Sequence, residues 1–323
     1  MSNNAKKPIE PINGWQKFMS NQQEQFFVSN FYKFFNVEEF ASLEQVSDQL
    51  SDLANSNHLS GLIILAAEGI NGTVAGTRQG VECFKESIAK KFSQNSFVYK
   101  DGTCNKNPFK RFKVKVRKEI VTTQLGDDAV VDPELNKLSP KEWNEMLNSG
   151  EEIAVLDTRN IYETEVGMFQ GAIDPRIKNF QEFSDYLESC PVPKDKKVLM
   201  YCTGGIRCEK AILDMRSHGY QQVFQLEGGI LNYLKEFPNE KFEGECFVFD
   251  HRVALNQDLE PTQTYGLCPH CGQPAKELLD CSYCENSAKV CDRCREASPR
   301  FHTCSKNCAY QYQLREERLA RKK

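Results

Sequence analysis

The sequence Val198-Leu199-Met200-Tyr201-Cys202-Thr203-Gly204-Gly205-Ile206-Arg207-Cys208 predicts the core of an α/β domain. Its first four residues are apolar and predict a short buried strand, and the pattern from Cys208 to His218 predicts a helix that ends at Gly219. Cys202 therefore lies between the carboxyl end of a strand and the amino end of a helix. Free backbone N–H groups and the positive end of the helix dipole favour the thiolate there, and the thiolate is the reactive form of cysteine. We predict that Cys202 is catalytic rather than a buried structural cysteine.

The loop that follows Cys202 carries the residues expected to stabilise its thiolate: Thr203, Gly204, Gly205, Ile206, Arg207 and Cys208. Arg207 adds a full positive charge, and we predict that it is catalytic as well. The two glycines allow the backbone to turn its amides toward the sulfur or toward an anion on it. Cys208 has two interpretations, which stay open: a resolving thiol at the start of the helix, or a residue that only packs there.

Residues 139–238 alternate between predicted strands and helices, which is typical of a parallel sheet with helices on both faces. The reactive site of such a sheet lies at the carboxyl ends of its strands, where Cys202 stands. The predicted elements are Ile153 to Leu156, Phe180 to Leu187, Val198 to Tyr201, Glu209 to His218, Val223 to Leu226 and Ile230 to Phe237.

The preceding region, residues 24–121, predicts a ferredoxin-like α+β domain with the order βαββαβ. We place an Asn71-Gly72 turn in the segment Glu68 to Gly72 and the last strand at Phe109 to Val116. The other elements expected are strands at Phe26 to Val37, Leu62 to Ala67 and Thr73 to Ala75, and helices at Leu43 to Leu53 and Thr77 to Phe92. Phe109 and Tyr99 are interpreted as core residues, with stacking on an unpaired base as the alternative.

From Lys106 to Lys118 the chain has seven basic residues and no acidic one. Charged and apolar residues alternate from Arg111 to Arg117, which predicts a strand with one apolar and one positive face. Cations at this spacing suit a nucleic-acid backbone, whereas the local alternative is a solvated strand whose lysines prevent edge pairing. Our candidate RNA-binding residues are Lys110, Arg111, Lys113, Lys115 and Arg117.

Eight of the 14 cysteines fall between Cys268 and Cys308. They form four pairs: Cys268-x2-Cys271, Cys281-x2-Cys284, Cys291-x2-Cys294 and Cys304-x3-Cys308. Four thiolates complete a tetrahedral zinc site, so the four pairs predict two zinc ions. Sequential and cross-braced pairing both stay open, and His270 or His302 could replace a cysteine. Spacing alone does not separate zinc from an iron–sulfur cluster or from a set of reduced thiols without an ion.

The composition of the 323-residue chain is that of an ordinary protein of two or three domains, with 40% hydrophobic and 27% charged residues. The net charge of −4 gives no general attraction to nucleic acid. The longest purely apolar run, Leu62 to Ala67, is too short for a membrane span. The first residues do not resemble a secretion signal, so we predict a cytoplasmic location, where clustered cysteines indicate metal rather than disulfides.

The expected organisation is an α/β and α+β multidomain protein. Its predicted parts are a polar tail (1–23), a ferredoxin-like RNA-contacting domain (24–121), a linker (122–138), a parallel-sheet domain (139–238), a connector (239–266), a cysteine-rich zinc-type module (267–309) and a charged helical tail (310–323).

Residues 139–238 resemble the rhodanese family. Three motifs carry the resemblance in the family's order: Leu156-Asp157-Thr158-Arg159-Asn160 with the Tyr162 to Ile173 segment, Val198 to Cys208, and Val223 to Leu234 with Glu227-Gly228-Gly229. The resemblance implies that Cys202 is the nucleophile, able to carry sulfur as a persulfide, and that Thr203 to Arg207 is its amide cradle. The phosphatase relatives have one more residue between cysteine and arginine, which disfavours phosphatase chemistry. We interpret Asp157, Arg159 and Glu163 as residues that support the site structurally.

The whole chain, from about Phe26 to Cys308, is similar to the oxygen-dependent tRNA uridine hydroxylase family. The similarity rests on the order of the segment Ala67-Glu68-Gly69-Ile70-Asn71-Gly72-Thr73, the basic strand, the Cys202 loop and the cysteine-rich end. It implies hydroxylation of carbon 5 of the wobble uridine to 5-hydroxyuridine, with molecular oxygen as co-substrate, tRNA as partner and Cys202 as the required cysteine. We expect neither DNA nor a membrane as partner, and no motif identifies a donor of sulfur or electrons.

Two chemical roles of Cys202 follow. Its thiolate could add to carbon 6 of uracil and make carbon 5 electron-rich, or it could carry a persulfide. The second role belongs to an alternative function, a rhodanese-type sulfurtransferase. A third function is a non-catalytic RNA-binding scaffold with a relic rhodanese domain, which the intact cysteine disfavours.

Overall fold

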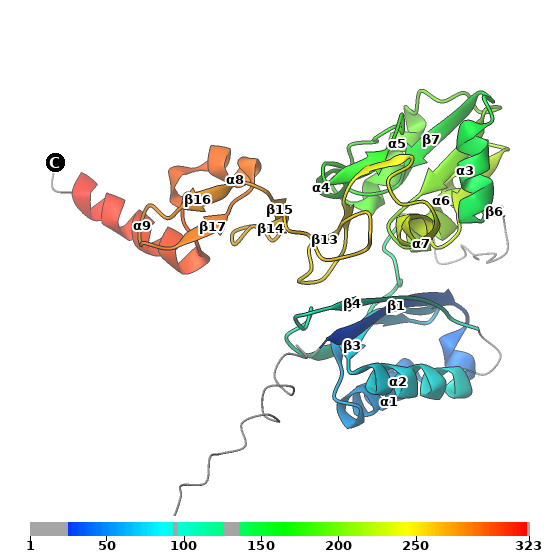
Figure 1. The fold of residues 1–323 in the computed structure, drawn as a ribbon, viewed down its shortest axis with the longest axis horizontal. Coiled ribbons are helices and arrows are strands. Elements are labelled where there is room, and N and C mark those ends of the chain that lie inside the picture. Colours follow the sequence, from blue (N-terminus) through cyan, green and yellow to red (C-terminus); the bar gives the residue numbers. More distant parts are fainter. Residues whose placement is uncertain (1–24, 93–95, 124, 126–135, 322–323) are drawn as a thin grey trace, which may run out of the picture.

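A computed structural model of the chain describes residues 25–92, 96–123, 125 and 136–321 (Figure 1). The predicted polar tail, most of the predicted linker and the last two residues of the predicted helical tail lie outside the described residues. The N-terminal domain (residues 25–123) lies against the central domain (residues 136–238), and the cysteine-rich module (residues 267–309) extends away from both (Figure 1). In the part of the chain described, no helix is long and apolar enough to cross a membrane.

The N-terminal domain consists of β1 (Phe26–Phe34), α1 (Leu43–Ser56), β2 (Ser60–Ala66), β3 (Gly69–Gly76), α2 (Arg78–Lys91), β4 (Val98–Cys104) and β5 (Phe112–Val116), with a 3-10 turn at Val37–Glu39. Side-chain caps at Ser42 and Thr77 begin the two helices. Both helices cover one face of the sheet, where Phe31, Ile63 and Phe84 are among the fully buried core residues (Figure 1).

The strand order of this sheet confirms the ferredoxin-like fold. The predicted position of the last strand in the βαββαβ unit is wrong. The strands lie in the order β4-β1-β3-β2-β5. The fourth strand of the βαββαβ unit is therefore Val98–Cys104, and the basic segment is a fifth strand at the edge, parallel to β2. The prediction missed β4 because Lys100 and Asp101 interrupt its apolar pattern; Asp101 binds Lys85 and Ser29, and Lys100 is buried against the central domain.

The predicted turn at Asn71-Gly72 is wrong. The turn occupies Ala67 and Glu68, and strand β3 already begins at Gly69. A side chain at Gly69 would place its Cβ 2.2 Å from the carbonyl oxygen of Lys33, so glycine is needed where β3 meets β1. Asn71 lies inside the ladder, opposite Ile64, and its side chain donates to the carbonyl of Ile120.

The central domain follows the order β6 (Lys137–Leu138), α3 (Pro140–Asn148), β7 (Ile153–Asp157), α4 (Ile161–Thr164), β8 (Gly167–Phe169), a 3-10 turn (Phe180–Glu182), α5 (Phe183–Glu188), β9 (Lys197–Tyr201), α6 (Ile206–Ser217), β10 (Val223–Leu226) and α7 (Gly229–Glu236). Its main sheet has the order β6-β10-β9-β7, and all its pairs are parallel, as predicted. Helices α5 and α6 pack on one face, and α3 and α7 on the other. Helix α6 begins at Ile206, two residues before the predicted start.

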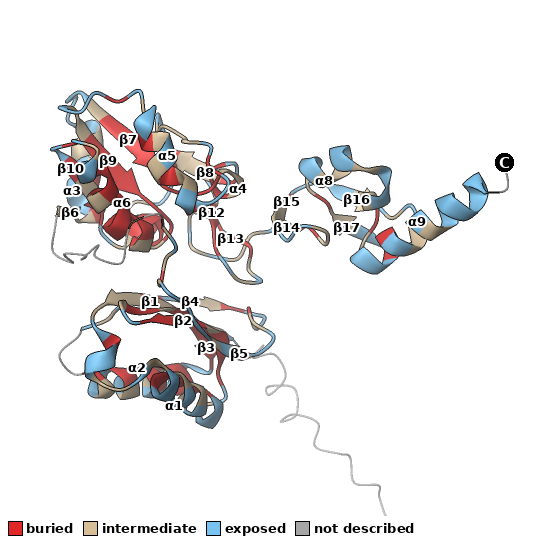
Figure 2. Cartoon of the chain, turned by 180° about the vertical axis from the view of Figure 1, so that it is seen from behind, coloured by how far each residue is buried: buried red, intermediate tan, exposed pale blue. Residues whose placement is uncertain are grey.

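The rest of the chain is built from short elements: β11 (Phe242–Gly244), β12 (Cys246–Phe247), β13 (Ala254–Leu255), β14 (Gly266–Leu267), β15 (Pro274–Ala275), β16 (Leu278–Asp280), β17 (Ser287–Lys289), α8 (Asp292–Ala297), a 3-10 turn (Pro299–Phe301) and α9 (Lys306–Ala320). Strand β11 pairs with β8, which attaches the connector to the central domain. Figure 2 shows that buried residues fill the two domains, whereas the cysteine-rich module is mostly exposed or half-buried.

Candidate active site

Cys202 lies directly after β9, at the amino end of α6, as the sequence predicts. Gly205 has a φ of 99°, which L side chains rarely adopt, and this turn brings its backbone N–H to 3.1 Å from the Cys202 sulfur. The side chain of Cys202 has no solvent-exposed surface. Cys202 is also one of the residues that line a cavity between the two domains.

The surroundings of Cys202 favour its thiolate. Burial alone would raise the pKa of Cys202, but a hydrogen bond from Cys208, the charge of Arg207 and the backbone N–H groups of Arg207 and Gly205 lower it to about 5. Burial and the neighbouring Cys202 sulfur raise the pKa of Cys208 well above its ordinary value, so Cys208 keeps its proton. At neutral pH the pair therefore consists of one thiolate and one thiol that donates to it. No cysteine among the described residues forms a disulfide.

The carboxylate of Glu163, a residue predicted to have only a structural role, holds Arg207. Its guanidinium binds Glu163 in a bidentate pair, with N–O distances of 2.6 and 2.7 Å. Burial opposes its charge, but Glu163 raises the pKa of Arg207, so it stays charged. The hydroxyl of Thr203 lies 3.3 Å from Glu163 and joins the loop to this pair. Glu163 thus fixes the position of Arg207 and also offsets most of its charge.

Asp157 and Arg159, which the sequence predicts to support the site structurally, lie at and just beyond the carboxyl end of β7, the strand beside β9. They form a fully buried ion pair with a 2.6 Å contact, and Arg159 also donates to the backbone carbonyl of Gly167. Helix α7 holds the Cys202 loop, because the N–H groups of Ile230 and Leu231 donate to the carbonyls of Cys202 and Thr203. The predicted Glu227-Gly228-Gly229 motif makes this close approach possible.

A cavity of about 530 Å³ lies above Cys202, between the two domains. The N-terminal sheet contributes the face that its own helices leave uncovered: Asn30, Tyr32, Leu62, Ile64, Asn71 and Thr73. The connector contributes Val248, Phe249 and Arg252. Phe249 is 60% exposed, and its ring lies 5.7 Å from the guanidinium of Arg207. Phe109 also lines the cavity, whereas Tyr99 packs in the core beneath the sheet.

Buried charges of α6 join the two domains. Lys210 contacts Glu68 at 2.6 Å and Glu119 at 3.3 Å, and its side chain is only 2% exposed. Next to it, Glu209 accepts a hydrogen bond of 2.9 Å from the hydroxyl of Tyr32. Glu68 also accepts from the backbone N–H of Ile120. These contacts give a structural role to the Glu68 to Thr73 segment, for which the residues alone suggested only a hairpin.

Comparison with known proteins identifies the same three parts. Residues 26–120 match the UPF0176 acylphosphatase-like domain, residues 139–236 the rhodanese-like domain, and residues 243–309 the rhodanese C-terminal family. A protein of Bdellovibrio bacteriovorus named tRNA uridine(34) hydroxylase is 46% identical over 92% of this chain and 84% of its own length. The chain belongs to the tRNA uridine(34) hydroxylase family. Proteins of the same name are 39% identical in Teredinibacter turnerae, over 83% of each chain, and 42% identical in a Picosynechococcus species, over 80% of this chain and 90% of its own.

In this member of the tRNA uridine(34) hydroxylase family, the basic strand lies beside the cavity. Lys110, Arg111, Lys113, Lys115 and Arg117 are all exposed. Phe112 and Val114 pack toward the helices, so the charged side chains alternate onto the opposite face of β5, and Arg117 lines the cavity. The apolar side of this alternation ends at Val116, which is 43% exposed.

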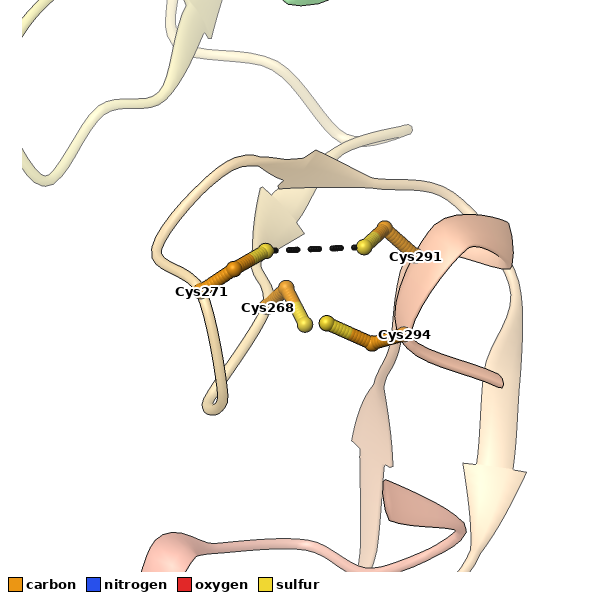
Figure 3. Close-up of side chains that lie close together, drawn as sticks. All are labelled: Cys268, Cys271, Cys291 and Cys294. Atoms are coloured by element: carbon orange, nitrogen blue, oxygen red, sulfur yellow. Dashed lines mark hydrogen bonds between the residues drawn. The ribbon is translucent and has the colours of Figure 1, made fainter. Parts of the chain in front are cut away.

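The eight cysteines of the module form two groups of four that alternate along the chain: Cys268, Cys271, Cys291 and Cys294, and Cys281, Cys284, Cys304 and Cys308. The pairing is therefore cross-braced. Within each group the sulfur atoms all lie within 4.8 Å of one another, and Figure 3 shows the first group converging on one point. His270 and His302 do not replace a cysteine, because each group consists of four cysteines. The Nε2 atoms of the two rings contact the backbone carbonyls of Thr303 and Arg295.

The geometry of both groups fits a tetrahedral metal ion. Bonds of about 2.3 Å from zinc to sulfur place neighbouring sulfurs about 3.8 Å apart. The Cys271–Cys291 and Cys284–Cys304 sulfur distances are 3.5 and 3.6 Å. Backbone N–H groups also point at Cys281 from 3.4 Å, as expected around a thiolate ligand. The apolar core of the module is small: its buried residues are Cys268, Ala275 and Val290.

Several residues of the site came from segments without a recognisable motif. Phe249 and Arg252 lie in the segment predicted only as a connector, and Tyr32 and Glu209 meet across the domain interface. The alternation along β1 could have indicated some of them. Asn30 and Tyr32 alternate there with the buried Phe31, so their side chains face away from the core of the domain.

Proposed function

We propose that this chain hydroxylates carbon 5 of the wobble uridine of tRNA, with the uracil ring bound in the cavity beside Cys202. The observation that carries the proposal is the cavity itself, which is lined both by Cys202, a cysteine of lowered pKa, and by Arg117 of the exposed basic segment. Its volume of about 530 Å³ lies in the range of small-molecule sites, about 300 to 1,000 Å³. The names of the relatives support the choice of tRNA uridine as substrate. A tRNA substrate also agrees with the predicted cytoplasmic location.

Cys202 acts as the nucleophile. A rotation of its side chain into the cavity brings the sulfur to carbon 6, and a sulfur–carbon bond forms as the C5=C6 double bond opens. The electron pair moves to carbon 5 and the O4 carbonyl, which makes carbon 5 electron-rich. After oxygen transfer, loss of the proton on carbon 5 and departure of the thiolate restore the double bond. Arg207 and the loop amides stabilise the thiolate before addition and after departure.

The sheet floor suits a uracil ring. Leu62 and Ile64 offer an apolar surface, and Asn30 and Asn71 flank it. Their side-chain N–H groups donate to Thr73 and Ile120, and no donor among the described residues reaches either amide oxygen. Such an oxygen can accept the N3–H of uracil, whereas cytosine has no proton at N3. Phe249 offers a ring on which the base or its neighbour can stack.

Molecular oxygen is the expected source of the new oxygen atom, as the family resemblance implies. Conversion of C5–H to C5–OH removes two electrons from the base. Oxygen accepts two more when its second atom becomes water, so the reaction also needs a reductant, which no residue identifies. We likewise propose zinc for both four-cysteine groups, because four thiolates in a tetrahedron favour it and the module needs the metal to fold.

The basic strand is proposed to hold the tRNA backbone while the base enters the cavity. Its edge position leaves Lys113 and Lys115 exposed on the sheet face that also bears the cavity. Replacing both by glutamate should weaken tRNA binding and reduce its salt dependence. The same change at Lys90 and Lys91, at the end of α2 on the opposite side of the sheet, is the matched control and should have little effect.

The deciding experiment compares tRNA nucleosides from cells that contain the parent chain, the Cys202→Ser variant or no copy. Loss of 5-hydroxyuridine and its derivatives with both defects supports the proposal. The exposed Cys83 supplies the control, and Cys83→Ser should leave the nucleosides unchanged. Full hydroxylation by Cys202→Ser would exclude Cys202 as nucleophile, whereas a covalent Cys202–uridine adduct would support it directly.

A persulfide on Cys202 is the competing role. The loop amides, with the N–H of Gly205 at 3.1 Å from the sulfur, suit one extra sulfur as well as they suit a thiolate. Turnover of thiosulfate and cyanide, together with loss of a thiolated rather than an oxygenated base, would support a sulfurtransferase instead.

A further inference from the structure

The buried Cys202 thiolate carries a negative charge that a nearby cation would stabilise. Arg207 is the nearest cation in the loop, but Glu163 holds it in a bidentate pair and both side chains are buried. Arg207 and Glu163 together carry no net charge. A buried thiolate needs a further cation or a strong set of donors, and the described loop supplies only amides and the Cys208 thiol.

Lys100 lies on the other side of the same loop. It stands in β4 opposite Asn30, on the sheet face that meets the central domain, and it is 7% exposed. Its side chain passes within 4.0 Å of the Cβ position of Gly204, and its ammonium lies 4.8 Å from the centre of the Tyr32 ring. Among the described residues no carboxylate forms an ion pair with Lys100; Glu209, the nearest acid in this interface, is already bound to Lys137 at 3.3 Å.

The groups around Lys100 are of both charges, and the Cys202 thiolate is one of the anions. Burial and two neighbouring lysines lower the pKa of Lys100 to about 8, and Cys202 and Glu209 oppose this shift. The charged and titratable groups that face Lys100 are Tyr32, Lys137, Cys202, Glu209 and Lys235. Glu209 is paired with Lys137, so it is not free to balance Lys100. The Cys202 thiolate is the other anion that faces Lys100, and its charge favours the protonated ammonium group.

We propose that Lys100 is a positioning residue of the active site, supplied by the N-terminal domain, whose ammonium group stabilises the Cys202 thiolate across the domain interface. Docking of the two domains thereby strengthens the ionisation of the nucleophile, because this supporting cation belongs to the other domain. This inference rests on the proposed function only in taking Cys202 as the nucleophile.

The test measures the reactivity of Cys202 in the full-length protein without tRNA. Iodoacetamide alkylation is followed by mass spectrometry from pH 4 to pH 9. Trypsin cleaves after Lys197 and Arg207, so Cys202 lies in a peptide that contains no other cysteine. The midpoint of the alkylation profile gives the pKa of the thiol. In Lys100→Met we expect this midpoint to rise by about one to two pH units, the usual effect of one nearby opposite charge.

Two further variants separate charge from packing. Lys100→Arg keeps the charge and should return the midpoint toward that of the parent. Lys90→Met removes an exposed lysine at the end of α2, on the opposite side of the N-terminal sheet, and should leave the midpoint unchanged. A Lys100→Met profile that coincides with the parent profile would overturn the proposal, and so would equal shifts in Lys100→Met and Lys100→Arg.

A reciprocal measurement covers the case in which Lys100→Met does not fold. Cys202→Ala removes the anion, and the pKa of Lys100, measured from the pH dependence of its acetylation, should then fall. An unchanged Lys100 pKa would refute the coupling. Hydroxylation of tRNA is assayed separately, so that a confirmed shift without any hydroxylation would count against the proposed function and not against the role of Lys100.

Discussion

Replacing Gly229 by alanine tests how the active-site loop is held. Gly229 begins α7 with a φ of +67°, and the helix end approaches the Cys202 loop so closely that an added Cβ would lie 2.4 Å from the carbonyl oxygen of Cys202. The same Cβ would lie 2.7 Å from the carbonyl oxygen of Thr203 and 2.8 Å from the nitrogen of Gly204. All three contacts are with backbone atoms, so no flexible side chain can move aside.

The geometry sets the size of the effect. Contacts below 3.0 Å essentially never occur for a real Cβ, so the loop must move by at least 0.6 Å, the difference between 3.0 and 2.4 Å. A left-handed backbone costs an alanine roughly 1–2 kcal/mol, and the forced displacement adds about 1–3 kcal/mol. A misplacement of about 1 Å at a reacting group can lower the rate by about 100-fold. We expect Gly229→Ala to be about 2–5 kcal/mol less stable, by the same sum, and strongly impaired in hydroxylation.

Gly219 provides the matched control. It also has a positive φ, +90°, but an added Cβ there meets nothing within 4 Å. Gly219→Ala should therefore lose only the backbone contribution of roughly 1–2 kcal/mol and keep its activity. Urea unfolding gives the stability difference, and Cys202 alkylation with tRNA hydroxylation reports on the site. Equal losses of stability and activity in the two variants would refute the argument that α7 positions the loop by close backbone contact.

Three other outcomes follow from the structure. The pKa of Cys202 is lowered to about 5 in the folded protein, against about 8.5 in an unfolded chain. The parent should therefore gain stability relative to Cys202→Ala as the pH rises from about 5 to about 8.5, with no further gain above that range. Urea unfolding at several pH values measures this difference. Lys210→Met should cost about 2 kcal/mol in urea unfolding, less than a fully buried pair, because its carboxylate partners are partly solvated. Cys268 and Cys291 belong to one group of four and Cys281 to the other. By elemental analysis, the double variant Cys268→Ser with Cys291→Ser should lose one metal ion, and Cys268→Ser with Cys281→Ser should lose both. Sequential pairing would reverse these two results.

The elements with clear apolar patterns could be predicted from the sequence. Strands β9 and β10 carry apolar runs and lie where the pattern places them, because a central parallel strand is buried on both faces. Strand β4 could not be recognised in this way. Its Lys100 and Asp101 point to opposite faces, and each has a partner that lies far away in the sequence. A charged residue in a strand looks like a loop residue until the partner that accepts the charge is known.

The same reason limits what could be predicted of the site. The Cys202 loop was recognisable because its chemistry is local: strand, glycines, arginine and helix follow one another within a single short segment. The partner of Arg207 is 44 residues away, and Tyr32 is 177 residues from Glu209. These pairs form only when the chain is folded and the two domains are docked, so no local spacing indicates them.

The arrangement also explains how a rhodanese-like loop can serve a chemistry other than sulfur transfer. The loop and its amide cradle stabilise an anion on Cys202, whatever that anion attacks. What the thiolate meets depends on the surface opposite it, and here that surface is the uncovered face of the N-terminal sheet, with Asn30 3.4 Å from the Cβ position of Gly204. Because the base-sized cavity requires both domains, the central domain alone would keep a reactive cysteine but lose the surface proposed to select uracil. The buried Lys210 contacts would therefore serve the proposed selection of uracil as well as stability, since they join the two domains that line the cavity.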